Sequence, residues 1–147
     1  YRKAQLATGT LIPESGTALI SVRTADQVAV IDIAKYLSDN GFSLVATEGT
    51  AHALERAGLK AAIVNKVHEG RPHVVDSIKN NEYDLIVNTT ASRHSRRDSE
   101  TIRRQALMHK VTYFTTLSAA RAACEAHRAG NDPSINRLQT LHQSVTL

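Results

Sequence analysis

Short runs of β-favouring apolar residues alternate along this chain with segments whose apolar residues recur at helical spacing. The predicted strands cover residues 18–22, 44–46, 61–64, 84–87 and 111–114, and the predicted helices cover residues 26–40, 50–57, 73–80, 99–109 and 117–129. Strands that are apolar on both sides are typical of parallel sheets covered by helices on both faces. With right-handed crossovers, this alternation predicts an α/β fold, a three-layer sandwich with a five-stranded parallel sheet.

Glycine, asparagine and proline mark the expected ends of several helices. Asn40-Gly41 ends the first helix, Gly58 ends the second, and the segment 130–133 closes the last. Asp98 or Ser99 is the expected N-cap of the helix that precedes the fifth strand.

A chain of 147 residues is long enough for one domain with a core of its own. Turn-forming residues predict a lead-in over residues 1–16, the folded domain over residues 17–133 and a polar tail over residues 134–147. The first residues lack both an initiator methionine and an apolar signal core, so we expect a piece of a longer polypeptide. No apolar run approaches the roughly 18 residues that span a membrane, and no membrane partner is expected.

The net charge of +4 raises the question of nucleic acid binding. The basic residues are spread along the chain apart from one cluster at residues 93–97, and none of the four Tyr and two Phe interleaves with it. A stacking platform is therefore not indicated, and attraction to a small anion explains the charge. Cys124 is the only cysteine, which excludes an internal disulfide and favours a reducing, cytoplasmic compartment. Its small-residue helical surroundings favour packing over nucleophilic chemistry.

Polar residues follow three successive predicted strands. Thr47-Glu48-Gly49-Thr50 leads into a helix, a polar loop starts at Asn65-Lys66, and Asn88-Thr89-Thr90 follows the fourth strand. Because the carboxyl ends of parallel strands share one edge, where such sheets bind ligands, these residues are expected to meet. Gly49 permits close approach of a ligand, and the hydroxyls, the helix N-terminus and the Lys66 ammonium suit a phosphate. The sequence therefore predicts a site for a small phosphate-bearing anion.

Less specific interpretations stand beside this one. Thr50 is equally well explained as a helix N-cap, and Lys66 as a solvated residue at a strand end. His68 and His73 match no standard metal-ligand spacing, and no metal site is expected. The chain has no GxxxxGK[ST], GxGxxG or GxSxG motif and no apparent pair of carboxylates, so we expect binding without catalysis.

The stretch from Asn65 to His73, together with residues 47–50 and 88–90, resembles the C-terminal allosteric domain of carbamoyl-phosphate synthase large chains. That domain belongs to the methylglyoxal-synthase-like superfamily, and the likeness covers nearly the whole chain. The resemblance implies a five-stranded parallel sheet flanked by helices. It also implies a regulatory domain that holds no cofactor and performs no reaction of its own.

The effectors are likewise implied by the resemblance. In bacterial members UMP inhibits, IMP binds an overlapping pocket, and ornithine activates from the interface with the neighbouring synthetase domain. The matching nucleotide-site positions are Thr47, Thr50 and Lys66 around the phosphate, with Asn88 and Thr90 along the pocket. Tyr113 and Thr115 match positions at the ornithine site. Gln27 stands where well-studied relatives carry a lysine, which predicts weaker phosphate binding or altered effector preference unless Arg23 supplies the charge.

The resemblance further implies a cytoplasmic parent enzyme that makes carbamoyl phosphate for pyrimidine and arginine biosynthesis. Its other synthetase domains would use ATP and Mg and would be the direct partners of this domain. A small glutaminase subunit would be an indirect partner, and self-association into a homo-oligomer is expected.

Two rival functions remain open. Methylglyoxal synthase resembles this fold, but that family uses an aspartate in a Gly-Gly-Asp loop where this chain has Glu69-Gly70-Arg71. A guanidinium stays protonated near neutral pH and cannot act as a general base. The second rival is a nucleic-acid-binding module, for which the candidate residues are Arg93, Arg96, Arg97, Arg103 and Arg104. A solvated helix face explains the same arginines.

Overall fold

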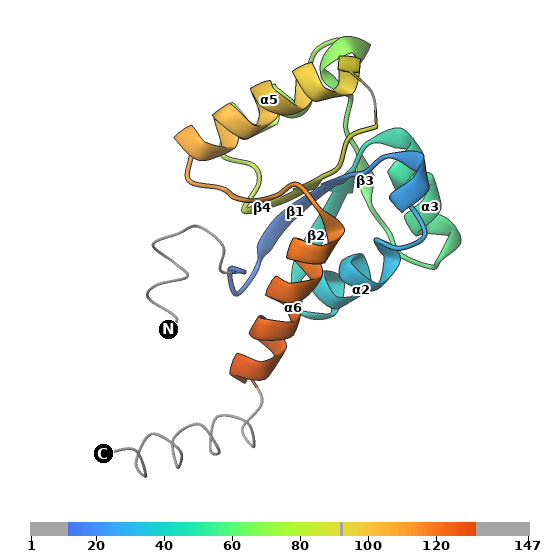
Figure 1. Ribbon diagram of the computed structural model, residues 1–147, viewed down its shortest axis with the longest axis vertical. Coiled ribbons are helices and arrows are strands. Elements are labelled where there is room, and N and C mark those ends of the chain that lie inside the picture. Colours follow the sequence, from blue (N-terminus) through green and yellow to red (C-terminus); the bar gives the residue numbers. More distant parts are fainter. Residues whose placement is uncertain (1–11, 92, 132–147) are drawn as a thin grey trace.

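A computed structural model describes residues 12–91 and 93–131 (Figure 1). The strands are β1 (Gly16–Ser21), β2 (Phe42–Ala46), β3 (Ala62–Ile63), β4 (Leu85–Asn88) and β5 (Thr112–Phe114). The helices are α2 (Ile31–Asp39), α3 (Glu48–Arg56), α4 (Val74–Lys79), α5 (Arg93–Met108) and α6 (Leu117–Asn131). Two 3₁₀ turns, η1 (Thr24–Asp26) and η2 (Val67–Glu69), precede α2 and α4.

The five strands form one parallel sheet in the order β3-β2-β1-β4-β5, with β1 at its centre. The chain first winds outward from β1 through β2 to β3, then returns to place β4 on the other side of β1. The direction of winding therefore reverses beside β1, which is where ligand crevices form in such sheets. Ser21 is paired with Asn88 at this point, so the ends of β1 and β4 lie level.

Helices cover both faces of the sheet, which confirms the predicted three-layer fold. Successive β1 residues point to opposite faces: Ile20 packs in the core cluster shared with α2, α3 and α6. Leu19 packs in a second cluster with residues of α4 and α5. Figure 1 shows α5 on one side of the sheet and α2 and α6 on the other.

Two predicted elements differ from the structure for identifiable reasons. The predicted strand over residues 61–64 is reduced to Ala62–Ile63 at the edge of the sheet, and Ile63 is 57% exposed. The apolar run had indicated a strand buried on both faces, but a strand at the edge of the sheet is not covered in this way. The helix predicted from residue 99 begins at Arg93, so Asp98 and Ser99 lie inside α5 and the expected N-cap is wrong. Its first turns carry polar residues, so apolar spacing did not reveal them.

The ends of two other helices also shift. The helix predicted from residue 26 is split into η1 and a shorter α2 that begins at Ile31. The last helix continues past the expected stop at Gly130 to Asn131. Residues 1–11 of the predicted lead-in and the whole predicted tail, residues 134–147, lie outside the described residues. In the described part of the chain, no helix has the length and apolar character needed to cross a membrane.

Candidate functional site

A pocket of about 330 Å³ opens at the carboxyl ends of β1, β2 and β4, beside the reversal of winding. Its wall includes all six residues that the sequence analysis assigned to a nucleotide pocket, which are Thr47, Gly49, Thr50, Lys66, Asn88 and Thr90. The volume lies within the range of small-molecule sites. Three separate chain segments thus meet where the sheet geometry predicts a ligand.

Thr47 and Thr50 join the start of α3 to the end of β1. Because α3 begins at Glu48, Thr50 lies in its first turn, where it is 1% exposed. The Thr50 Oγ1 accepts a hydrogen bond from the Val22 N–H at 3.2 Å and donates to the Val22 carbonyl at 3.3 Å. Thr50 is therefore a tether between two elements, and its interpretation as the N-cap is wrong. Thr47 is the N-cap, but its hydroxyl donates to Ser21 Oγ at 3.2 Å and makes no capping bond.

Gly49 and Gln27 lie close together on the wall of the pocket. A Cβ atom added to Gly49 would stand 3.1 Å from Gln27 Nε2, so the glycine makes room for this amide. Arg23 also lines the pocket, but its Nε donates to Asp26 Oδ2 at 2.8 Å. The positive charge of Arg23 is thereby partly balanced by Asp26.

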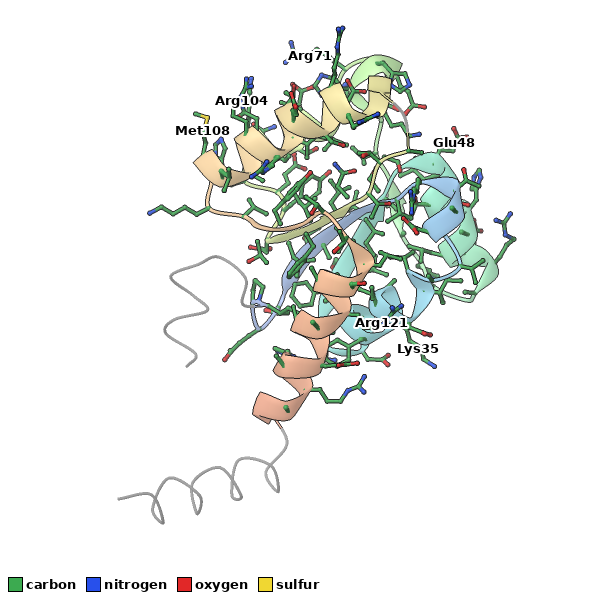
Figure 2. The ribbon with its side chains drawn as sticks, in the orientation of Figure 1. Lys35, Glu48, Arg71, Arg104, Met108 and Arg121 are labelled. Atoms are coloured by element: carbon green, nitrogen blue, oxygen red, sulfur yellow. The ribbon has the colours of Figure 1, made fainter. Side chains whose placement is uncertain are left out.

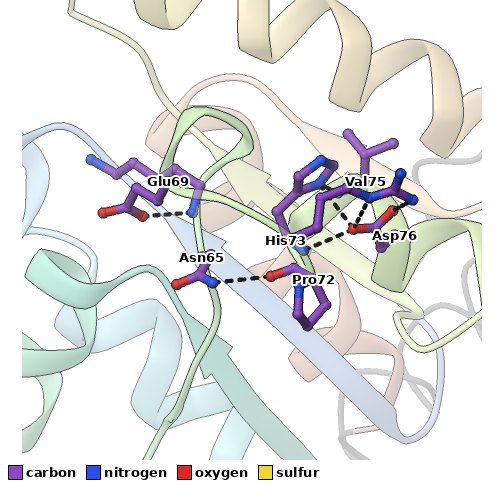
Figure 3. Close-up of polar contacts among 8 residues, drawn as sticks. Asn65, Glu69, Pro72, His73, Val75 and Asp76 are labelled. Atoms are coloured by element: carbon purple, nitrogen blue, oxygen red, sulfur yellow. Dashed lines mark hydrogen bonds and ion pairs between the residues drawn. The ribbon is translucent and has the colours of Figure 1, made fainter.

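Lys66 is the N-cap of η2 and lies three residues beyond the end of β3. Its backbone N–H donates to Glu69 Oε1 at 2.6 Å (Figure 3). Among the described residues, no carboxylate lies within 4.0 Å of the Lys66 ammonium. Nearby, His68 Nδ1 lies 3.2 Å from Asp98 Oδ2, a contact that links η2 to α5 at the pocket. The Lys66 ammonium thus keeps its charge available for an anion.

Asn88 connects the pocket to β5. Its buried side-chain Nδ2 donates to Ser99 Oγ and to Tyr113 Oη, each at 2.9 Å. Tyr113 and the exposed Thr115 stand outside the wall of the pocket as the described residues form it. Burial raises the pKa of the Tyr113 hydroxyl, against the lowering effects of the Asn88 hydrogen bond and the Arg103 charge.

Comparison with known proteins identifies the family of this chain. The sequence profile of the MGS-like domain matches residues 29–115, which include most of the pocket. The chain belongs to the MGS-like domain family. A methylglyoxal synthase from Elizabethkingia anophelis NUHP1 has a similar structure, with a TM-score of 0.62 over 84% of this chain and 82% of that one. At 13% identity, that likeness confirms the fold alone.

Sequence relatives of this MGS-like domain include carbamoyl phosphate synthase large chains. Those of Vibrio parahaemolyticus and Pseudomonas putida are each 51% identical over 145 residues, and that of Vibrio cholerae is 50% identical. Each match covers 99% of this chain and 14% of the relative, so the chain spans about one seventh of their length. These matches confirm the resemblance drawn from the sequence.

The MGS-like domain also lines its pocket with residues that sequence reasoning did not assign to it. Those that carry polar side chains are Ser21, Thr24, His68, Thr89, Asp98 and Ser99. Ser21 and Thr89 lie at the ends of β1 and β4. Their position at the polar ends of predicted strands is the sequence feature that could have assigned them to the pocket. Thr89 Oγ1 accepts a hydrogen bond from the Arg23 N–H at 3.0 Å. Asp98 and Ser99 were missed because the start of α5 was placed too late.

Several other side chains of the MGS-like domain that could take part in binding lie outside the pocket. Arg71 forms an ion pair with Asp76 at 2.6 Å, and this pairing raises the pKa of the guanidinium. Arg104 and Met108 project from α5 away from the sheet (Figure 2). Within residues 12–91 and 93–131, no three His, Cys, Asp or Glu side chains are grouped to hold a metal ion.

Proposed function

We propose that this MGS-like domain is the regulatory domain of a carbamoyl-phosphate synthase large chain and binds nucleotide monophosphates, with UMP as inhibitor and IMP as a second ligand. The observation that carries the proposal is the pocket itself. It combines the first turn of α3, which the Thr47 and Thr50 hydroxyls hold to the end of β1, with the Lys66 ammonium, and no carboxylate of the described residues lies within 4.0 Å of that ammonium. A helix N-terminus and a nearby cation together favour a phosphate dianion.

The rest of the pocket suits the polar remainder of a nucleotide. Asn88 and Thr90, at the end of β4, line the same pocket, and there the Asn88 side-chain oxygen and the Thr90 hydroxyl would meet the nucleotide. Gln27 adds a neutral amide rather than a second cation. We therefore expect the phosphate to depend mainly on Lys66 and the helix terminus, and the affinity to be lower than in relatives with a lysine at position 27.

Regulation would work through a population shift. An effector changes a distant reaction only by binding two conformations with different affinities. The proposed parent enzyme would make carbamoyl phosphate in the cytoplasm for pyrimidine and arginine biosynthesis, with ATP and Mg bound in its other domains. A small glutaminase subunit and further copies of the large chain would complete it. Tyr113 and Thr115 would contribute to an ornithine site shared with the neighbouring synthetase domain.

Calorimetric titration of the chain with UMP and with IMP tests the proposal. We expect saturable binding by the unmodified chain and a loss of about tenfold or more in the Lys66→Ala variant, because a charged hydrogen bond to phosphate is removed. Lys60→Ala is the matched control, since Lys60 is an exposed lysine outside this pocket. Equal weakening of nucleotide binding by both substitutions would mean that the loss comes from the change in net charge and not from the position of Lys66. Absence of binding to either nucleotide would refute the proposal.

A further inference from the structure

The segment that carries Lys66 has little apolar contact to hold its shape. From Asn65 to Pro72 every residue is exposed except Val67, which is partly buried against the core cluster of α4 and α5. A loop without buried apolar side chains gains little from packing and must be ordered by polar contacts. The position of Lys66 therefore depends on the hydrogen bonds and ion pairs of this segment.

One set of hydrogen bonds closes the base of the loop. Asn65 Nδ2 donates to the Pro72 carbonyl at 3.1 Å (Figure 3). The Val74 N–H donates to the Asn65 carbonyl at 3.0 Å. Within the loop, the Glu69 N–H donates to the Lys66 carbonyl at 3.0 Å. These contacts fix the two ends of the loop and the η2 turn, but they leave the stretch through Arg71 to be held by other groups.

The Asp76 carboxylate holds that stretch. Oδ1 accepts from Arg71 Nη2 at 2.6 Å, while Oδ2 accepts from Arg71 Nε at 3.2 Å and from the His73 N–H at 3.0 Å. The Asp76 side chain is 14% exposed on α4, whereas Arg71 is 77% exposed. Two parallel bonds between a guanidinium and a carboxylate fix direction as well as distance. Asp76 thus anchors the far side of the loop to a helix that is itself packed on the sheet.

We propose that Asp76 is a positioning residue that, through Arg71, holds the loop so that Lys66 stands at the pocket before a ligand arrives. This inference rests on the proposed nucleotide function and extends it to residues that do not line the pocket. A preorganised loop loses less conformational entropy when the phosphate binds, so the affinity is higher. Without the anchor, the loop samples other arrangements and Lys66 is in place for only part of the time.

The substitution Asp76→Asn distinguishes a positioning role from an electrostatic one, because the two predict opposite changes in the affinity for UMP. It removes a negative charge from a chain that binds an anion, so electrostatics alone predicts tighter binding of UMP. Loss of the bidentate anchor predicts the reverse, a dissociation constant for UMP raised about tenfold. Asp32→Asn is the matched control, since Asp32 is an exposed aspartate near the start of α2. Binding of UMP that is unchanged or tighter in Asp76→Asn would overturn the inference.

A double-mutant cycle separates positioning from a general loss of structure. If Asp76 acts through Lys66, then Asp76→Asn weakens UMP binding in the unmodified chain and has little further effect beside Lys66→Ala. Additive losses would overturn the inference. Asp76→Glu keeps a carboxylate and should restore much of the affinity, whereas a purely steric role for Asp76, which the isosteric asparagine preserves, would make Asp76→Glu more damaging than Asp76→Asn.

Hydrogen exchange of the ligand-free chain distinguishes failure of this inference from failure of the proposed function. If UMP and IMP do not bind, the proposed function is refuted, and the order of the loop can still be measured directly. We expect the backbone amides of Lys66 and Glu69 to exchange about tenfold faster in Asp76→Asn, with amides of β1 unchanged. Equal exchange of these loop amides in both proteins would refute the anchoring itself.

Discussion

Replacing Thr50 by valine tests whether the Thr50 hydroxyl holds α3 to the end of β1. Valine has nearly the same shape, so the main loss is the pair of hydrogen bonds to the Val22 backbone at 3.2 and 3.3 Å. Leaving buried polar groups without partners costs about 1–3 kcal/mol each. Both bonds are near the long limit of their kind, so we expect a total loss of about 2 kcal/mol in the free energy of unfolding.

Urea unfolding followed by circular dichroism measures this loss. With a slope near 1.5 kcal/mol per molar urea, a loss of about 2 kcal/mol lowers the midpoint by roughly 1.3 M. Thr50→Ser is the control, because it keeps the hydroxyl and removes one methyl group for about 1 kcal/mol. Thr50→Ser should also retain UMP binding that Thr50→Val loses. A midpoint lowered by less than about 0.3 M in Thr50→Val, or a larger loss in Thr50→Ser, would refute the reasoning.

Three other features of the fold can be tested separately. Gly16→Ala should destabilise the fold by about 3 kcal/mol in urea unfolding, because φ is +137° and the new Cβ would lie 2.1 Å from Asp84 Oδ2. Gly58→Ala, at φ +85° with open space around it, should cost only about 1 kcal/mol. The thiol of Cys124 should react with Ellman's reagent at pH 8 at least about 100-fold more slowly than in urea, since burial raises its pKa to about 11. Asp76 has a pKa of about 2 in the folded chain against about 3.9 unfolded, so its contribution to stability is complete above about pH 4 and is lost as the pH falls toward 2. Urea midpoints between pH 2 and 5 should therefore fall less steeply in Asp76→Asn.

Each of these expectations has an outcome that contradicts it. Equal losses in Gly16→Ala and Gly58→Ala would mean that the contact with Asp84 relaxes without cost. Rapid labelling of Cys124 in the folded chain would place the thiol in reach of solvent. If the urea midpoints of the unmodified chain and of Asp76→Asn fall alike between pH 5 and pH 2, then the Asp76 carboxylate titrates alike in the folded and unfolded states.

The sheet was predictable because its signal is local. Apolar residues in the segments of β1, β2 and β4 face the two core clusters in alternation, and this two-sided burial is what their composition indicated. The strand order was not predictable, since pairing such as Ser21 with Asn88 joins residues far apart in sequence. The start of α5 was missed for a related reason: its first residues are polar in sequence, so they carry no apolar periodicity.

The wall of the pocket was predictable as far as strand ends define it. Thr47 and Asn88 follow or end strands, so the common edge of a parallel sheet brings them together without further information. The role of Thr50 was not predictable, because its partner Val22 lies 28 residues away. Nor could spacing reveal that Asn88 divides its two amide hydrogens between Ser99 and Tyr113, which depends on how α5 and β5 pack.

The Asp76 carboxylate beside the Lys66 loop is poorly suited to act as a general base. A general base works best with a pKa near the operating pH. Asp76, the carboxylate anchored beside the Lys66 loop, accepts three hydrogen bonds, and its pKa of about 2 leaves little driving force for taking a proton. Asp98, on the pocket wall, lies against His68. The same contacts that order the loop thus keep the Asp76 carboxylate ionised, whereas the Lys66 ammonium and the first turn of α3 line the pocket itself.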